Sequence, residues 1–349
     1  MLSQFNGSFQ PGILHNYAPQ LTAFEYAADP NARGCETNSK PHSLLFIGGL
    51  GDGYSTVPYL NDITTALEAE KWSVFSVELT SSYKGWGLSN LGSDVDEIGK
   101  CVEYVKEYKS ASEQEPGKIV IMGHSTGSQD VLHYLYSQNP GPEATTPRPP
   151  VDGAIMQAPV SDREAILNIV KSGNDQDTPA ELTKIYNNLI SMAKSEKTLG
   201  GKDVILPIWM VGKVYIPDTA VSATRFLSLA SPDSPEAPGE DDLFSSDLTD
   251  ARLQETFGMI SSKGLLKKSL LVMPGGDDEY VAPWIDKEKL LERWKAATTK
   301  DSKNPHIWST DSAIIVGAKH SPSGPDQAQP RKDLVSRVKA FLADIERQN

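Results

Sequence analysis

Ser125 stands at the centre of the pentapeptide Gly-His-Ser-Thr-Gly, which spans residues 123–127. A branched apolar run at 119–122 precedes it, and an amphipathic helical pattern at 128–136 follows it. Glycines on both sides allow a sharp turn from strand to helix, which holds the serine Oγ at the carboxyl edge of a sheet. Gly-x-Ser-x-Gly arises by chance in roughly one chain in ten of this length, so the surrounding pattern is decisive. It predicts a nucleophile elbow with Ser125 as the nucleophile.

A serine hydroxyl is a good nucleophile near neutral pH only with a base beside it, and the base needs an orienting carboxylate. After an elbow the chain order is serine, acid, histidine, each just beyond a core strand. His320 follows the apolar run 313–316 and is the predicted base, with His306 as the alternative. The other histidines precede Ser125 or lie in the elbow helix, and we expect them to pack elsewhere: His15, His42, His124 and His133.

Three acidic residues, Asp277, Asp278 and Glu279, follow the apolar run 270–273. Asp277 and Asp278 are both candidates for the carboxylate that orients the base. Together the three could instead bind a metal, but no His or Cys stands near them at ligand spacing, so we expect no metal site. The glycines at 48–53 match neither the Walker pattern nor Gly-x-Gly-x-x-Gly, so we expect no cofactor.

Strand and helix patterns alternate on both sides of Ser125, after two strand-like stretches at 12–18 and 21–27. Further strands are predicted at 43–47, 72–79, 119–122, 151–159, 268–273 and 311–316. Helices are predicted at 57–70, 91–108, 128–136, 286–297 and 333–347. This alternation predicts an α/β fold with a mainly parallel central sheet covered by helices on both faces.

The alternation stops between residues 161 and 265. Helical patterns at 162–171, 179–194 and 247–257 occur there, with an acidic, proline-rich loop at 231–242. Such an insertion lies over the carboxyl edge of the sheet and usually forms a lid. The predicted organisation is therefore a core in two parts, 1–160 and 266–349, with a helical lid at 161–265.

The chain has 349 residues and a formal net charge of −13. A single elaborated domain of this length can bury a large core. The negative charge argues against a nucleic-acid partner, which requires a basic surface. It favours cationic over anionic small molecules near the mouth of a site.

The first seven residues lack the basic and apolar regions of a leader, and no stretch approaches the ~18 apolar residues of a membrane span. Cys101 lies on the apolar stripe of the predicted helix 91–108, so we expect a buried thiol rather than a disulfide with Cys35. These features predict a soluble, cytoplasmic protein.

The acidic loop resembles the corresponding segment of the α/β-hydrolase superfamily, Gly-x-x-Asp-x-x-Val with a proline close behind. Gly275, Asp278, Val281 and Pro283 match that spacing. The resemblance therefore implies an α/β-hydrolase fold and selects Asp278 over Asp277 as the acid.

The same resemblance implies the oxyanion hole. The superfamily normally uses the backbone N–H after the nucleophile and one from the loop after the third strand. In this chain these are the N–H groups of Thr126 and Leu50. Gly48-Gly49 stands where the superfamily often has His-Gly, a departure that matters little because the donor is backbone.

A narrower resemblance spans nearly the whole chain. Segments 46–54, 78–91, 157–165 and 241–248 are similar to those of a fungal family of cytosolic α/β hydrolases that includes the fusarinine C esterase. Its specific motifs are Tyr-x-Gly-Trp-Gly at 83–87, Asp-Arg-Glu-Ala at 162–165 and Phe-Ser-Ser-Asp at 244–247. These motifs could equally be structural, with Asp162 capping a lid helix and Arg163 pairing with a carboxylate.

This resemblance implies a serine esterase that opens ester bonds of a ferric hydroxamate siderophore through an acyl-enzyme, so that iron is recovered inside the cell. A carboxylesterase or lipase for acyl esters is the alternative. It would need a long apolar channel, which residues of the predicted lid could line: Ile205, Ile208, Trp209, Met210 and Val211. A binding protein without catalysis fits less well, because all three triad candidates are present.

Overall fold

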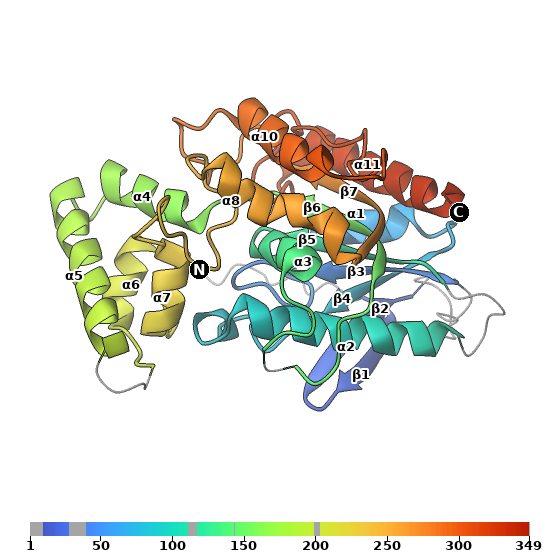
Figure 1. Ribbon diagram of the computed structural model, residues 1–349, viewed down its shortest axis with the longest axis horizontal. Helices are drawn as coiled ribbons and strands as arrows, with labels where there is room; N and C mark the ends of the chain where they lie inside the picture. The colour runs from blue at the N-terminus through green and yellow to red at the C-terminus, as the bar shows by residue number, and fades with distance from the viewer. Residues whose placement is uncertain (1–9, 28–39, 111–116, 143, 199–202, 349) are drawn as a thin grey trace.

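The computed structural model describes residues 10–27, 40–110, 117–142, 144–198 and 203–348. Within these residues the strands form one seven-stranded sheet in the order β1-β2-β4-β3-β5-β6-β7 (Figure 1). The strands are β1 (Gly12–Ala18), β2 (Leu21–Tyr26), β3 (His42–Ile47), β4 (Trp72–Val77), β5 (Ile119–His124), β6 (Val151–Gln157) and β7 (Leu266–Met273). β1 pairs with β2, and β2 with β4, in antiparallel register, and the remaining pairings in this sheet are parallel.

Helices cover both faces of the sheet, because alternate residues of each central strand are apolar and point to opposite sides. In β3, Leu45 and Ile47 pack into one cluster with the inner stripes of α2 and α3, whereas Leu44 and Phe46 pack on the other side with α1 and α11. The helices are α1 (Tyr59–Ala66), α2 (Leu91–Ser110), α3 (Thr126–Tyr136), α10 (Lys287–Lys300) and α11 (Ala328–Arg347).

The strand predicted at 311–316 is wrong. On the side of β7 away from β6, the segment around 308–315 makes only isolated bridges, at Trp308 with Leu270 and at Ile315 with Gly275. Between these bridges Val272 donates its backbone N–H to the Ser312 Oγ at 3.0 Å, so a side chain occupies the place of a ladder carbonyl. The segment therefore runs beside the edge of β7 as irregular chain and not as a strand.

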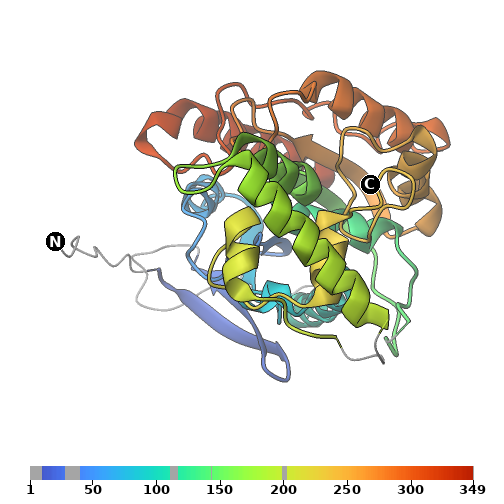
Figure 2. The ribbon, with the colours of Figure 1, turned by 90° about the vertical axis from the view of Figure 1, so that its left-hand side faces the viewer.

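Four helices of the predicted insertion gather at one end of the molecule, apart from the sheet (Figure 1), and Figure 2 views them face on. They are α4 (Asp162–Ser172), α5 (Pro179–Thr198), α6 (Ile208–Val214) and α7 (Ala223–Ala230). Their apolar stripes share a separate core, which also contains Trp86 from the loop after β4 and part of Leu50 from the loop after β3. These helices therefore lie over the carboxyl ends of the strands.

The later part of the same segment packs differently. The short helices α8 (Asp250–Glu255) and α9 (Ile260–Lys263) contribute Leu253 and Ile260 to the cluster beneath α3 and α10. The layer with its own core is thus limited to α4 to α7. The division of the chain at residues 161 and 265 stays a prediction.

No helix among the described residues is long and apolar enough to cross a membrane. Cys101 is fully buried on α2, as its place on the apolar stripe predicts. Cys35 and the first seven residues lie outside the described residues.

Candidate active site

Ser125 lies in the turn between β5 and α3, with backbone angles φ 55° and ψ −123°. A positive φ is costly for a serine and persists only where the surrounding structure enforces it. Both neighbouring glycines are required, since a Cβ on Gly123 would lie 2.0 Å from the Gly127 carbonyl oxygen, and one on Gly127 would lie 2.5 Å from that of Ile47. The predicted strand, turn and helix around Ser125 are thus present.

His320 bridges the other two predicted residues. Its Nε2 atom lies 2.8 Å from Ser125 Oγ, and its Nδ1 atom lies 2.8 Å from Asp278 Oδ2. The second oxygen of Asp278 accepts the backbone N–H of Tyr280 at 3.0 Å. A buried carboxylate on Nδ1–H keeps the Nε2 lone pair directed at the serine hydroxyl, which is the arrangement of a Ser-His-Asp triad.

Of the two candidate acids, the structure brings Asp278 to His320. Asp278 is buried, whereas Asp277 is exposed in the same turn and donates its backbone N–H to Ala318. The alternative base His306 is exposed and lies outside this arrangement. The remaining histidines also lie outside the triad: His15 is on β1, His42 begins β3, His124 ends β5 and His133 is on α3.

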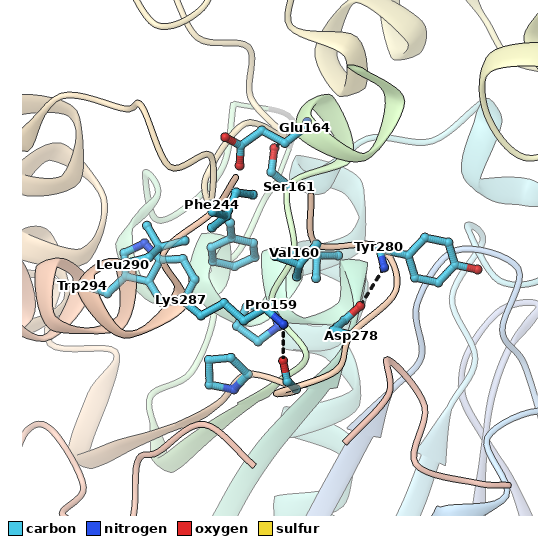
Figure 3. Close-up of a pocket in the computed structure, with 14 residues that line it drawn as sticks. Pro159, Val160, Ser161, Glu164, Phe244, Asp278, Tyr280, Lys287, Leu290 and Trp294 are labelled. Carbon is cyan, nitrogen blue, oxygen red and sulfur yellow. Dashed lines mark hydrogen bonds between the residues drawn. The ribbon is translucent and has the colours of Figure 1, made fainter. Parts of the chain in front are cut away.

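The turn that carries Asp278 is fastened to α10. Lys287 donates from its Nζ to the carbonyl oxygens of Gly275, at 3.2 Å, and Gly276. Figure 3 shows this contact beside a mainly apolar pocket that Asp278 also borders, with the Tyr280 ring directed away from that pocket. Tyr280 instead packs edge-on against the His320 ring, with centroids 4.7 Å apart.

The loop after β3 lies directly against Ser125. A Cβ on Gly49 would approach the Ser125 Cβ to 2.6 Å, so glycine is required for this contact. Asp52 shapes the loop, because its Oδ2 accepts the Gly49 N–H at 2.9 Å and its own N–H donates to the Gly49 carbonyl at 3.0 Å. Leu50 lies in this turn, directly after Gly49, and Thr126 is the first residue of α3, directly after Ser125.

His124 is buried beside the triad, with its ring centroid 5.1 Å from that of His320. Burial, together with the nearby positive charge that His320 can carry, lowers the pKa of His124 to about 4. His124 therefore stays neutral at physiological pH, and its Nδ1–H donates to Gln157 Oε1 at 2.5 Å. A neutral His124 does not repel a protonated His320.

Two of the motifs that resemble the fungal family contact each other. Arg163 pairs with Asp242 at 3.0 Å and with Asp247, and Glu164 accepts the Ser246 backbone N–H at 3.0 Å. Ser161 caps α4 by accepting the Glu164 N–H, so the capping role suggested for Asp162 is wrong. These contacts tie the start of α4 to the loop before α8.

Two carboxylates of the acidic loop 231–242, Asp241 and Asp242, are buried and paired with arginines. Arg225 of α7 binds both oxygens of the buried Asp241, at 2.6 and 2.7 Å, and Asp242 pairs with Arg163. Exposed carboxylates near His320 come instead from Asp277 and Glu279, and Glu279 accepts the His320 backbone N–H at 2.9 Å. The described residues contain no group of three or more His, Cys, Asp or Glu side chains that could hold a metal ion.

Sequence reasoning missed several residues that shape the site. Asp52 had a signal, because an Asp in a glycine-rich turn commonly binds nearby backbone N–H groups. The sequence suggests Glu279 only as a possible metal ligand. Gln157 and Tyr280 contact His320 from distant segments, and Lys287 contacts a turn that lies 11 and 12 positions before it. No local sequence pattern predicts these contacts.

A family profile described as "Protein of unknown function (DUF1749)" matches residues 5–343. Among curated proteins, Esterase AN6793 of Emericella nidulans is 50% identical, over 96% of this chain and 93% of its own length. Fusarinine C esterase sidJ of Aspergillus fumigatus is 49% identical, over 96% of both chains.

Solved structures agree with these matches. The structure titled "Siderophore hydrolase EstB from Aspergillus fumigatus" is 49% identical and superposes with a TM-score of 0.86 over 98% of this chain and 99% of its own. A protein described as having an alpha/beta hydrolase fold superposes with a TM-score of 0.55 at 14% identity, over 98% of both chains, and supports the fold alone. The predicted α/β-hydrolase fold is thus confirmed. The chain therefore belongs to the DUF1749 family and is an α/β hydrolase related over nearly its full length to the fusarinine C esterase of Aspergillus fumigatus.

Proposed function

We propose that this protein is a serine esterase that hydrolyses ester bonds of a hydroxamate siderophore of the fusarinine C type. The observation that carries the proposal is the position of His320, 2.8 Å from both Ser125 Oγ and Asp278 Oδ2. Relatives named as a fusarinine C esterase and a siderophore hydrolase, both 49% identical, support the substrate class.

In the first half of the reaction, Ser125 Oγ attacks the ester carbonyl while His320 Nε2 takes the hydroxyl proton. Asp278 stabilises the imidazolium that forms and holds its tautomer. The tetrahedral intermediate collapses when His320 returns the proton to the alcohol oxygen. The alcohol leaves, and the acyl group remains on Ser125.

The second half repeats these steps with water. His320 removes a proton from the water as it attacks the acyl-enzyme, then protonates Ser125 Oγ as the acid product departs. In both halves the backbone N–H groups of Leu50 and Thr126 stabilise the oxyanion. The N–H of Thr126 suits this role because the first N–H groups of a helix have no partner within the helix and carry partial positive charge.

The charge around the site is compatible with a cationic substrate. Asp277 and Glu279 are exposed next to the acid of the triad, whereas Asp241 and Asp242 are neutralised by arginines. Fusarinine C carries protonated amines. Exposed carboxylates at the mouth would raise its local concentration there.

The layer α4 to α7 acts, in this proposal, as the lid through which the ester reaches Ser125. Its core also contacts Leu50 of the oxyanion loop, so movement of the layer would displace that loop. We also propose that the reaction takes place in the cytoplasm and releases iron from the opened siderophore.

A carboxylesterase or lipase activity remains the second candidate, and one observation favours it. Ile205, Ile208 and Trp209 are exposed on the α6 side of the lid, with 66% of Trp209 accessible. Met210 and Val211, in contrast, are buried in the core of the lid, which leaves them unable to line an acyl channel.

A substrate panel separates the two candidates. Purified protein is incubated with ferric fusarinine C, its triacetylated form, and p-nitrophenyl esters of short and long acyl chains, and initial rates are compared. The proposal predicts the highest kcat/KM on fusarinine C. Inactivity on both siderophores together with rapid turnover of long-chain esters would replace the siderophore assignment by the lipase.

A further inference from the structure

Gln157 is the last residue of β6, in the segment Gln157-Ala158-Pro159 that resembles the fungal family. β6 pairs with β5, the strand that ends in the nucleophile turn, and on its other side with β7, which leads to Asp278. The side chain of Gln157 is 1% exposed. A buried amide must find partners for its polar atoms, and those partners reveal what it holds.

The backbone carbonyl of Gln157 holds the nucleophile. It accepts the backbone N–H of Ser125 at 3.0 Å and the hydroxyl of Ser128 at 2.9 Å. The following residue, Ala158, has φ 47°, a left-handed conformation that is unusual for a residue with a side chain. The Ala158 N–H is bound to the Met273 carbonyl at 3.0 Å, which helps to fix the carbonyl of Gln157 towards the elbow.

The side chain of Gln157 holds the base. Its Nε2 donates to the backbone carbonyl of His320 at 3.2 Å. Its Oε1 accepts the hydroxyl of Tyr59 at 2.8 Å and the Nδ1–H of His124. The orientation of the amide follows from chemistry, because the His320 carbonyl can only accept a hydrogen bond and so must face the nitrogen.

One residue therefore binds the peptide N–H of the nucleophile and the peptide carbonyl of the base, two residues that lie 195 positions apart in the chain. Among the described residues, the other tether on the His320 backbone is Glu279, which accepts its N–H. Glu279 is exposed, and solvent weakens this contact. The tether from Gln157 is fully enclosed.

We propose that Gln157 is a positioning residue that sets the separation between Ser125 and His320. The inference rests on the catalytic roles proposed above for those two residues. Proton transfer needs the two side chains within hydrogen-bond distance, and a displacement of about 1 Å at a reacting group can cost 10²-fold in rate. Gln157 does not touch the reacting atoms, so its effect appears in kcat and not in substrate affinity.

The test compares Gln157→Met with Tyr59→Phe. Methionine keeps the volume but loses the donor to His320, whereas phenylalanine removes a hydrogen bond from the opposite end of the same amide and leaves that donor in place. We expect kcat to fall ~10- to 100-fold in Gln157→Met with KM unchanged within about threefold. Tyr59→Phe is expected to keep kcat within about twofold despite a comparable loss of thermal stability.

Equal kcat values in Gln157→Met and Tyr59→Phe would overturn the proposal and assign Gln157 a purely structural role. Ser125→Ala is measured alongside. If Ser125→Ala keeps the wild-type rate, the proposed function itself fails. If Ser125→Ala is inactive while Gln157→Met has a normal rate, only the role of Gln157 fails.

Gln157→Glu provides the test if the methionine variant does not fold. It retains the size and the acceptor for Tyr59 and His124, and only its protonated form can donate to the His320 carbonyl. Asp278 and Glu279 face His320, and Asp52 lies 3.9 Å from His124, so their charges are present in both enzymes. Ionisation of the introduced glutamate removes the donor to the His320 carbonyl. We therefore expect the ratio of kcat in Gln157→Glu to kcat in wild type to fall as pH rises from 6 to 9. A ratio near one throughout would contradict the proposal.

Discussion

Asp278 Oδ2 lies 2.8 Å from His320 Nδ1, while the adjacent Asp277 projects into solvent from the same turn. Two consecutive carboxylates thus have opposite environments. The difference arises because Lys287 and the Tyr280 N–H hold the turn so that only the second aspartate faces the core. The two residues form a natural matched pair for experiment.

Asp278→Asn should lower kcat by about 10⁴-fold, because an asparagine stabilises the wrong tautomer of the histidine. Asp277→Asn should leave kcat within a few fold, since its side chain does not contact His320. Both variants remove one negative charge from the same turn, so each controls for the other. Steady-state ester hydrolysis measures the effect, and a larger loss in Asp277→Asn would move the acid by one residue.

Substrate charge should affect the rate. We expect faster hydrolysis of fusarinine C than of its triacetylated form at low salt, because exposed Asp277 and Glu279 attract protonated amines. The preference should shrink as ionic strength rises and the Debye length falls below about 10 Å. It should also shrink in Asp277→Asn. Equal kcat/KM for the two siderophores at low salt would exclude the electrostatic contribution.

Two buried histidines should make stability depend on pH. Burial lowers the pKa of His124 and of His133 to about 4 in each case. The unfolded chain binds these protons near pH 6.5 and the folded chain does not, so their contribution is complete above pH 6.5 and is lost as pH falls towards 4. Each full shift corresponds to roughly 3 kcal/mol.

Urea unfolding between pH 7 and 4.5 measures this effect. His133→Asn should reduce the slope of unfolding free energy against pH, and the control His306→Asn should not, because His306 is exposed. An unchanged slope in His133→Asn would show that the folded protein accepts the proton at that residue.

Arg225 should be essential for the packing of α7 on the rest of the molecule. It binds both oxygens of the buried Asp241 and donates from Nε to the Trp86 carbonyl at 3.0 Å. Arg225→Gln leaves a buried carboxylate without its charge partner, which typically costs about 3–5 kcal/mol. The control Arg347→Gln, at a side chain that is 71% exposed, should change the unfolding free energy by less than about 0.5 kcal/mol. Equal effects would argue against a buried ion pair.

The elbow could be predicted from sequence because all of its determinants are local. The apolar run, the glycines and the helix around Ser125 are consecutive, and each constrains the same turn. The fold could be predicted for a similar reason, since the alternation of strand and helix patterns is also read from consecutive residues. The helices α6 and α7 were not predicted. They have only seven and eight residues, too few for a period of 3.6 to stand out.

Contacts between distant segments could not be predicted in the same way. The false strand at 311–316 has a branched apolar sequence, but its pairing is replaced by the Ser312 side chain, which binds the Val272 N–H. Gln157 likewise carries no local signal, because its partners Tyr59, His124 and His320 come from three separate segments.

The role of Ser125 is tested by the rate at which wild type and Ser125→Ala open ferric fusarinine C, followed by chromatography of the products. We expect rapid cleavage by wild type and a loss of about 10⁶-fold in kcat for a correctly folded Ser125→Ala. His320→Ala should be similarly inactive, because triad residues act as a unit. Retention of a tenth or more of the wild-type rate in Ser125→Ala would contradict the assignment of Ser125 as the nucleophile.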